Sequence, residues 1–107
     1  MGFMEFQLWL TGSLREERIF QTLKGLSYFN ARYDSQNGIL VIIRSTGKQG
    51  QLRDNQIAEI FDRYETGSKT DRNMTSFYNH PRWPETPSLI LAPYVPAIIR
   101  AWIEEKP

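Results

Sequence analysis

The segment Tyr28–Arg44, YFNARYDSQNGILVIIR, contains the clearest secondary-structure signal in the chain. Asn37 and Gly38 form the pair preferred in type I′ hairpin turns, because both central positions of that turn need a positive φ angle. Runs rich in β-branched and aromatic residues flank this pair, Tyr28–Tyr33 before it and Ile39–Arg44 after it. The segment therefore predicts two antiparallel strands joined by a tight turn.

The second of these strands is apolar along its whole length. Its residues do not alternate between apolar and polar types: Ile39, Leu40, Val41, Ile42 and Ile43. A strand that is apolar on both sides needs cover on both of its faces. Two arrangements satisfy this requirement: helices on both faces of the sheet, or a second subunit over one face.

The sequence before the hairpin predicts a strand followed by a helix. Met4–Leu10 alternates between apolar and polar residues, which indicates a half-buried strand. Ser13 and Glu16 have the spacing of a capping box, and Gly25 is a typical residue at the end of a helix. We therefore expect a helix from about Leu14 to Lys24.

The sequence after the hairpin predicts two more helices. Apolar residues recur at helical spacing between Asp54 and Gly67, at Ile57, Ile60, Phe61 and Tyr64. Tyr94–Glu105 also has a helical pattern, with Pro96 tolerable in its first turn. Between these helices, Thr66–Pro87 is polar and contains several prolines, which predicts a long irregular segment, and Ser88–Ala92 predicts a short strand.

These elements follow one another in the order β-α-β-β-α-(β)-α. Because sequential strands usually pair, we expect an α+β fold with a small, mainly antiparallel sheet and helices packed against it. The 107 residues suffice for one hydrophobic core, so we expect residues 1–107 to form a single compact α+β domain.

The composition limits the classes of function. Thirteen basic residues oppose twelve acidic ones, so the net charge of +1 gives no strong overall field toward nucleic acids or membranes. The absence of cysteine excludes disulfides, thiol catalysis and thiolate metal sites, and it favours a cytoplasmic protein. No apolar run approaches the ~20 residues that span a bilayer, so no membrane partner is expected.

The sequence contains no recognisable catalytic or cofactor motif. The loop after Ile43 departs from the phosphate-binding P-loop pattern, because Ile42 and Gln49 occupy two of its diagnostic positions. His80 is the only histidine, and no carboxylate lies at a recognisable spacing from it. We therefore expect a protein that is not an enzyme and that uses no cofactor or metal. An enzyme using His80 with Tyr78 or Arg72 would need a concave pocket around His80.

The stretch RSTGKQGQLR, residues 44–53, is the first candidate binding site. Arg44, Lys48 and Arg53 contribute three cations with no acid between them, and the small residues allow backbone N–H groups to converge on an anion. A helix expected to begin just afterwards would add its positive N-terminal end. This pattern predicts a phosphate-binding loop. The alternative is an ordinary solvated turn between a strand and a helix.

The polar segment after residue 66 is the second candidate binding site. Its cations stand among aromatic residues, a pattern typical of surfaces that bind single strands by stacking and phosphate contacts. We expect phosphate contacts from Lys69, Arg72 and Arg82, and base stacking by Tyr78 or Trp83. The alternative is that the aromatic residues fix this long segment to the core.

Two functional hypotheses follow from these patterns. The first is a small non-catalytic module that binds nucleic acid through its basic loop. The alternative is a homodimeric or adaptor module, in which Ile98, Ile99 and Trp102 of the last helix contact a partner instead of the protein's own core. Geometry distinguishes them: the first hypothesis is favoured if both basic segments lie on one face, and the second is favoured if they point apart.

Overall fold

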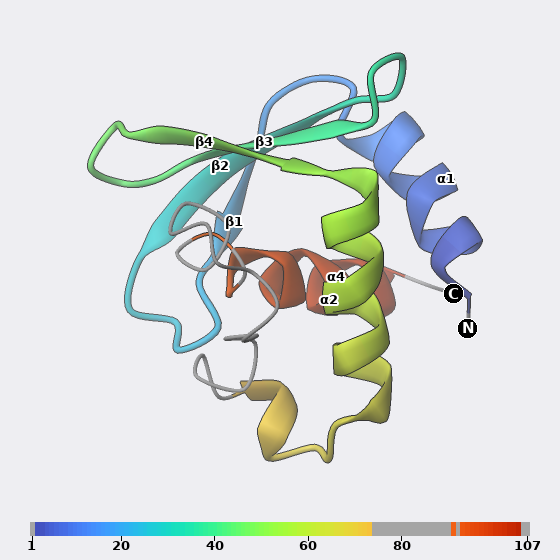
Figure 1. Cartoon of the computed structure of the whole chain (residues 1–107). Coiled ribbons are helices and arrows are strands. Elements are labelled where there is room, and N and C mark those ends of the chain that lie inside the picture. The colour runs from blue at the N-terminus through green and yellow to red at the C-terminus, as the bar shows by residue number, and fades with distance from the viewer. Residues whose placement is uncertain (1, 74–90, 92, 106–107) are drawn as a thin grey trace.

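The computed structural model describes residues 2–73, residue 91 and residues 93–105 (Figure 1). The elements in chain order are α1 (Phe3–Ser13), β1 (Arg18–Gln21), β2 (Tyr28–Asp34), β3 (Ile39–Ile43), β4 (Gln49–Arg53), α2 (Asp54–Thr66), the 3-10 helix η1 (Asp71–Asn73) and α4 (Tyr94–Glu105). The four strands form one antiparallel sheet in the order β1-β2-β3-β4. The predicted α+β fold, with an antiparallel sheet and helices packed against it, is confirmed.

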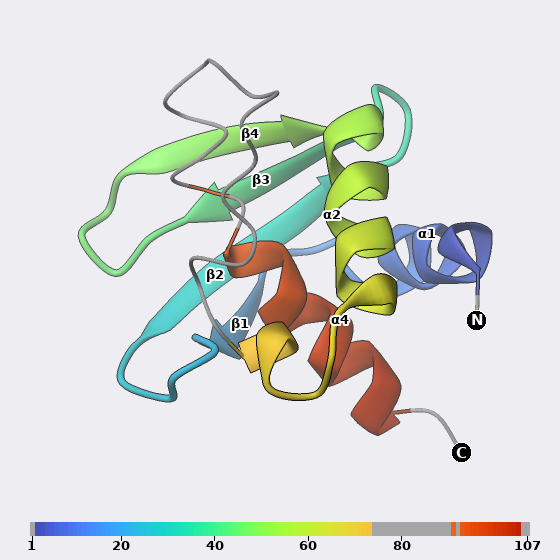
Figure 2. The same cartoon turned by 60° about the horizontal axis from the view of Figure 1, so that its bottom comes forward.

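Helices α1, α2 and α4 lie on the same side of the sheet (Figures 1 and 2). Their aromatic side chains meet between the helices, where the ring of Phe6 lies 5.4 Å from that of Phe61 and 5.2 Å from that of Trp102. The inward residues of the strands complete this core, including Phe29, Ala31, Tyr33, Leu40, Ile42 and Leu52. The protein is therefore a two-layer structure with its core between sheet and helices.

Strand β3 is buried asymmetrically. Leu40 and Ile42 are fully buried in the core, whereas Val41 points to the opposite face because successive strand residues alternate. Val41 is nevertheless only 3% exposed, and Ile39 and Ile43 are half-buried. The first arrangement predicted for this strand, with helices on both faces of the sheet, is not found among the described residues, because all their helices lie on one face. A second subunit over the outer face stays a prediction.

The first two elements differ from the prediction, because a helix replaces the predicted strand and a strand follows where a helix was predicted. Residues 4–10 belong to helix α1, and the helix predicted over residues 14–24 is replaced by a loop and strand β1. The buried stripe of α1 is Phe6, Leu10 and the following Leu14, which recur every four residues. Met4 and Leu8, which complete the alternating pattern, are largely exposed. The alternation was therefore a coincidence within a helical pattern.

The predicted hairpin between β2 and β3 is confirmed, but its turn differs. Asp34 pairs with Ile39, so residues 35–38 form a four-residue loop. The Asp34 carboxylate accepts hydrogen bonds from the backbone N–H groups of Gln36 and Asn37 and from the Asn37 side chain. Gly38 alone of the Asn-Gly pair takes a positive φ, +63°. The aspartate thus organises a longer loop than the type I′ turn.

Strand β4 was not predicted, because its sequence QGQLR has few typical strand residues. Its Gly50 leaves space for Leu91, whose side chain lies where a Cβ at Gly50 would be. Of the strand predicted over residues 88–92, only this buried Leu91 belongs to the described residues. Helix α2 begins at Asp54 and is followed by Gly67, and α4 spans Tyr94–Glu105, both as predicted.

A polar network connects the start of α2 to the sheet and to α1. The Tyr33 hydroxyl donates to Asp54 Oδ1 at 2.7 Å, and Gln7 Nε2 donates to Asp54 Oδ2 at 3.0 Å. The Asp54 N–H donates to the carbonyl of Gly38 at 3.0 Å. Burial, followed by the hydrogen bond to Asp54, raises the pKa of Tyr33 above its ordinary value. Asp54 therefore fixes the position of three elements.

We expect Gly38→Ala to destabilise the protein more than Gly47→Ala. Both glycines have positive φ, so each substitution should cost about 1 kcal/mol in backbone strain. A Cβ at Gly38 would also lie 2.5 Å from Asp54 Oδ2, whereas one at Gly47 meets nothing within 4 Å. Displacing Asp54 should raise the total for Gly38→Ala to roughly 2–3 kcal/mol in urea unfolding. Equal losses for the two variants would contradict the role given to Asp54.

We expect the stability of the protein to fall above pH 10, partly through Tyr33. Because the pKa of Tyr33 is raised in the folded state, its contribution is complete below the ordinary tyrosine pKa of 10.0 and is lost as pH rises further. Tyr64, whose pKa is raised by burial, contributes in the same direction. Tyr33→Phe should therefore lower stability at pH 7 and flatten its decline above pH 10, measured by urea unfolding across pH. Tyr28→Phe, at an exposed tyrosine, is the control and should leave both unchanged.

Candidate nucleic-acid interface

The charges of this protein are segregated between its two layers. Residues 18–53, which form the sheet and its loops, contain a single acid, Asp34, and six basic residues: Arg18, Lys24, Arg32, Arg44, Lys48 and Arg53. This segment therefore carries a charge of +5, and the remainder of the chain carries −4, since the total is +1. The nearly neutral total hides a strongly basic sheet.

The sheet has an outer face, opposite the helices, formed by the residues that alternate with the buried ones: Ile19, Gln21, Tyr28, Asn30, Arg32, Asp34, Ile39, Val41, Ile43, Gln49, Gln51 and Arg53. Arg32 and Arg53 are both exposed there. Arg32 pairs with Val41, and Arg53 pairs with Ile39, so the two arginines lie in adjacent rows on either side of β3. The outer face thus combines an apolar middle strand with cations on both sides.

Two hairpin tips, residues 22–27 and residues 44–48, carry the other cations of the sheet. Lys24 lies on the first tip, and Arg44 and Lys48 lie on the second. Because the strands follow one another as a meander, both tips are at the same end of the sheet, and both project away from α1 and α2 (Figures 1 and 2). Neither tip contains an acidic residue. The charges carried by the two tips themselves are therefore all positive.

The first hairpin tip is held in place by α4. The Arg100 guanidinium donates to the carbonyl oxygens of Leu23 and Thr22, each at 3.2 Å. A pocket of about 330 Å³ lies beside this contact, and Lys24 and Glu104 are among its lining residues. The contact fixes the loop that carries Lys24 and that leads into β2.

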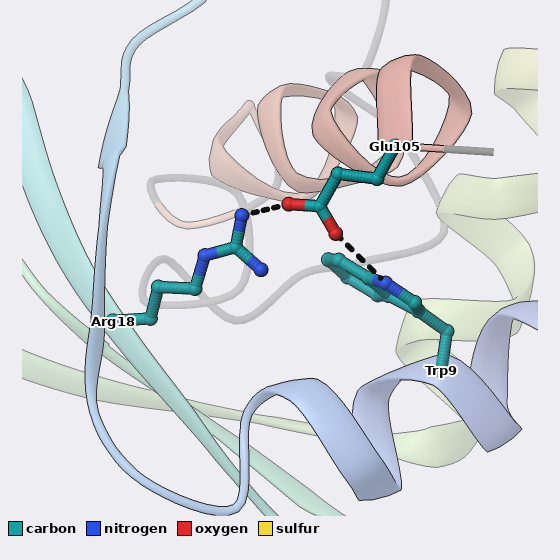
Figure 3. Close-up of polar contacts among 3 residues, drawn as sticks. All are labelled: Trp9, Arg18 and Glu105. Atoms are coloured by element: carbon teal, nitrogen blue, oxygen red, sulfur yellow. Dashed lines mark hydrogen bonds and ion pairs between the residues drawn. The ribbon is translucent and has the colours of Figure 1, made fainter. Parts of the chain in front are cut away.

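Arg18 is the exception among the cations of the sheet, because it points toward the helices (Figure 3). It forms an ion pair with Glu105 of α4, and its guanidinium lies 5.7 Å from the Trp9 ring and 5.2 Å from the Phe20 ring. The Trp9 indole N–H donates to the second oxygen of Glu105 at 3.1 Å. The charge of Arg18 is therefore paired with an acid of the helix layer.

Asp34 lies on the outer face two residues from Arg32. Its carboxylate oxygens accept the three hydrogen bonds of the β2–β3 loop, and the pKa of Asp34 is lowered chiefly by the hydrogen bond from the Asn37 side chain and to a minor extent by the charge of Arg32. Asp34 lies at the far end of β2 from the hairpin tips. Lys24, Arg44 and Lys48 are therefore separated from the one acid of the sheet.

The structure divides the first predicted site. Arg44 and Lys48 share one turn, in which the Arg44 N–H donates to the Lys48 carbonyl at 2.9 Å. Arg53 lies at the other end of β4, about 16 Å from Lys48 at roughly 3.3 Å per strand residue. The expected loop between a strand and a helix is a β-hairpin turn instead, and α2 begins beyond β4. The predicted combination of the loop with a helix N-terminus is therefore wrong.

The second predicted site does not join the first among the described residues. Arg72 Nε donates to the Tyr64 carbonyl at 2.6 Å and Arg72 Nη2 to the Glu65 carbonyl at 3.2 Å, so Arg72 caps the C-terminal end of α2. Helix α2 starts at the end of β4 opposite the β3–β4 hairpin tip and runs away from the sheet, so the segment after α2 lies far from Arg44 and Lys48 (Figure 1). The remaining predictions of that segment lie outside the described residues: Tyr78, His80, Arg82 and Trp83.

The apolar residues predicted for a dimer interface lie in the protein's own core. Ile98 and Ile99 are fully buried and Trp102 is 4% exposed, within the cluster that joins α4 to the sheet and to α1. A partner has no access to these three side chains in the folded chain. A homodimer therefore needs a different surface.

Sequence reasoning did not single out Lys24, Arg32 or Tyr28, which the structure exposes on the outer face and the first hairpin tip. Two signals were present: the alternation of Phe29, Ala31 and Tyr33 with polar residues, and the near absence of acids from residues 18–53. The near absence of acids is informative only once residues 18–53 are known to form one sheet. It was concealed by the nearly neutral charge of the whole chain.

Comparison of the chain with protein-family models, with curated proteins and with solved structures finds no match. Among the described residues, no helix combines the length and apolar character needed to cross a membrane. The chemistry of the site therefore has to be inferred from the geometry and charge of the chain itself.

We expect Arg72→Ala to reduce stability without changing affinity for oligonucleotides. The substitution removes two hydrogen bonds at the end of α2, which should cost about 1–2 kcal/mol in urea unfolding. Arg72→Lys is a suitable comparison, because it keeps the charge but not the guanidinium that reaches both carbonyls. If Arg72→Ala bound oligonucleotides more weakly at unchanged stability, Arg72 would be a binding residue and not a helix cap.

Proposed function

We propose that this protein is a non-catalytic module that binds the phosphate backbone of nucleic acid through the outer face and the two hairpin tips of its sheet. The observation that carries the proposal is the charge of residues 18–53, six basic residues against one acid. Four of these cations lie on the outer face or on the second hairpin tip: Arg32, Arg44, Lys48 and Arg53. Lys24 lies on the first tip, beside a pocket that Glu104 of α4 also lines. Phosphate groups are the ligands that such a surface favours.

The acidic helix layer does not cancel this field at the sheet surface. A helix with its side chains is about 10–12 Å wide, whereas charges are screened over about 8 Å at physiological ionic strength. An exposed acid of α2 such as Asp62 therefore acts weakly at the outer face, whereas Glu104 of α4 lies closer, in the pocket beside Lys24. The same acids repel a polyanion that approaches the helix layer, so the segregation also orients the ligand.

The outer face also carries neutral groups that suit nucleic acid. Gln21, Gln49 and Gln51 are exposed there, and each side-chain amide can both donate and accept hydrogen bonds. The guanidinium of Arg32 can hold a phosphate through two parallel hydrogen bonds. Cations for phosphates and amides for sugars or bases thus lie on one accessible surface.

A second copy of the chain is a less suitable occupant of the same surface. Ile39 and Ile43 are half-buried apolar residues that a partner could cover, whereas Val41 between them is already buried in the single chain. A symmetric face-to-face dimer, however, would bring Arg32 and Arg53 of one copy against those of the other, and such like charges repel. Charge complementarity therefore favours a polyanion over self-association.

We expect the double variant Arg32→Gln/Lys48→Gln to weaken oligonucleotide binding and to reduce its salt dependence. The logarithm of the affinity falls as the logarithm of the salt concentration rises. Each lost phosphate contact should make this slope less steep by about 0.7–0.9, so the double variant should make it less steep by roughly 1.4–1.8. The measurement is fluorescence anisotropy of a labelled oligonucleotide over a series of salt concentrations.

The matched control for this experiment is Arg15→Gln. Arg15 is also exposed, but it lies between α1 and β1, beside Glu16 and Glu17. A slope unchanged by the double variant, or an equal loss with Arg15→Gln, would overturn the proposal. Light scattering on the same samples tests the alternative, because a stable dimer that binds no oligonucleotide would favour self-association.

A further inference from the structure

Tyr28 is an aromatic residue that the core does not use. It is 56% exposed on the outer face, whereas Tyr33 on the same strand is 4% exposed and Tyr64 is 7% exposed. The adjacent Phe29 points inward and contacts the rings of Phe20 and Tyr94 at 5.7 and 4.9 Å. Tyr28 thus presents its ring to solvent from a rigid strand, at no benefit to the folded core.

The surroundings of Tyr28 combine apolar surface with cations. Ile19, 62% exposed, is its diagonal neighbour on β1, since Ile19 pairs with Asn30 and Gln21 pairs with Tyr28. Such diagonal side chains lie about 7–8 Å apart, close enough for a ring and a branched side chain to form one platform.

The cations of both hairpin tips lie at the same end of the sheet as Tyr28. Tyr28 directly follows the first tip, which carries Lys24. The β2–β3 ladder ends at the pair Asn30 and Ile43, and Tyr28 lies two residues, about 7 Å, beyond that pair, on the side where Arg44 begins the second tip. The exposed ring therefore has Lys24 of the first tip on one side, and Arg44 and Lys48 of the second tip on the other.

From this arrangement, and resting on the proposed function, we infer that the ligand is single-stranded nucleic acid and that Tyr28 stacks against one of its bases. The bases of a duplex are paired and stacked within it, so a duplex offers such a surface mainly its phosphates. A single strand offers phosphates and unstacked bases together, and an aromatic ring accepts any base because each has a π face. The cations of the tips then hold the phosphates on either side of the stacked base.

The test compares Tyr28→Ala and Tyr28→Phe with the parent protein on single-stranded and double-stranded oligonucleotides of the same sequence. The parent should bind the single strand more tightly. Tyr28→Ala should weaken single-strand binding by about 5- to 150-fold and duplex binding by less than about 2-fold. Tyr28→Phe keeps the ring and should stay within about 3-fold of the parent on both ligands.

Two controls separate stacking from other effects. Leu8→Ala removes a comparably exposed apolar side chain, 70% exposed, from α1 and should leave both affinities unchanged. Because Tyr28 is exposed, neither of its variants should change the urea-unfolding midpoint appreciably. Circular dichroism and unfolding of each variant check that the fold is retained.

The outcomes also separate this inference from the proposed function. If Tyr28→Ala leaves single-strand binding unchanged, or weakens both ligands equally, while Arg32→Gln/Lys48→Gln still lowers affinity, the stacking inference is wrong and the phosphate-binding function stands. If neither variant changes any affinity, both are wrong. If Tyr28→Ala changes the oligomeric state by light scattering instead of single-strand affinity, Tyr28 is a protein contact and the inference is overturned.

Discussion

Every side chain of β2 and β3 points either into the helix layer or away from it, because successive residues of a strand alternate between faces. Helices α1, α2 and α4 occupy one face, so Phe29, Ala31 and Tyr33 are committed to the core and their neighbours are committed to the outer face. A shift of register by one residue would exchange the two sets and bury Arg32 without a partner. This constraint determines both the core of the protein and the composition of its accessible surface.

The charge distribution follows the same two-layer division. Cations of the sheet gather on the outer face and hairpin tips, while α2 and α4 carry Asp62, Glu65 and Glu104 on the other layer. Arg18 is the one cation of the sheet that enters the helix layer, and there it meets Glu105 (Figure 3). A nearly neutral protein can therefore present a strongly basic surface, which its total charge does not reveal.

Sequence reasoning succeeded where a pattern had only one interpretation. The β2–β3 hairpin, α2 and α4 have clear periodicity and clear boundaries, and their positions were predicted. It failed at α1 because Phe6 and Leu10 fit both an alternating and a four-residue spacing, and only tertiary packing distinguishes the two.

For the candidate site, the sequence indicated Arg44 and Lys48 but could not show that β4 separates them from Arg53 or that Arg72 caps α2. Those facts depend on contacts between residues that lie far apart in the chain or in elements that the local pattern does not reveal. The sequence is thus informative about which residues are cationic, and the fold decides which of them act together.

The meander order of the sheet has a consequence for how the chain reaches its native state. Each strand pairs with its neighbour in sequence, so the sheet can assemble by successive closure of short loops, which carries a small entropic cost. The hydrogen bond from Trp9 to Glu105 instead joins residues 96 positions apart. We therefore expect the sheet to be the early-folding unit, and docking of α4 beside α1 to be a late step that completes the core.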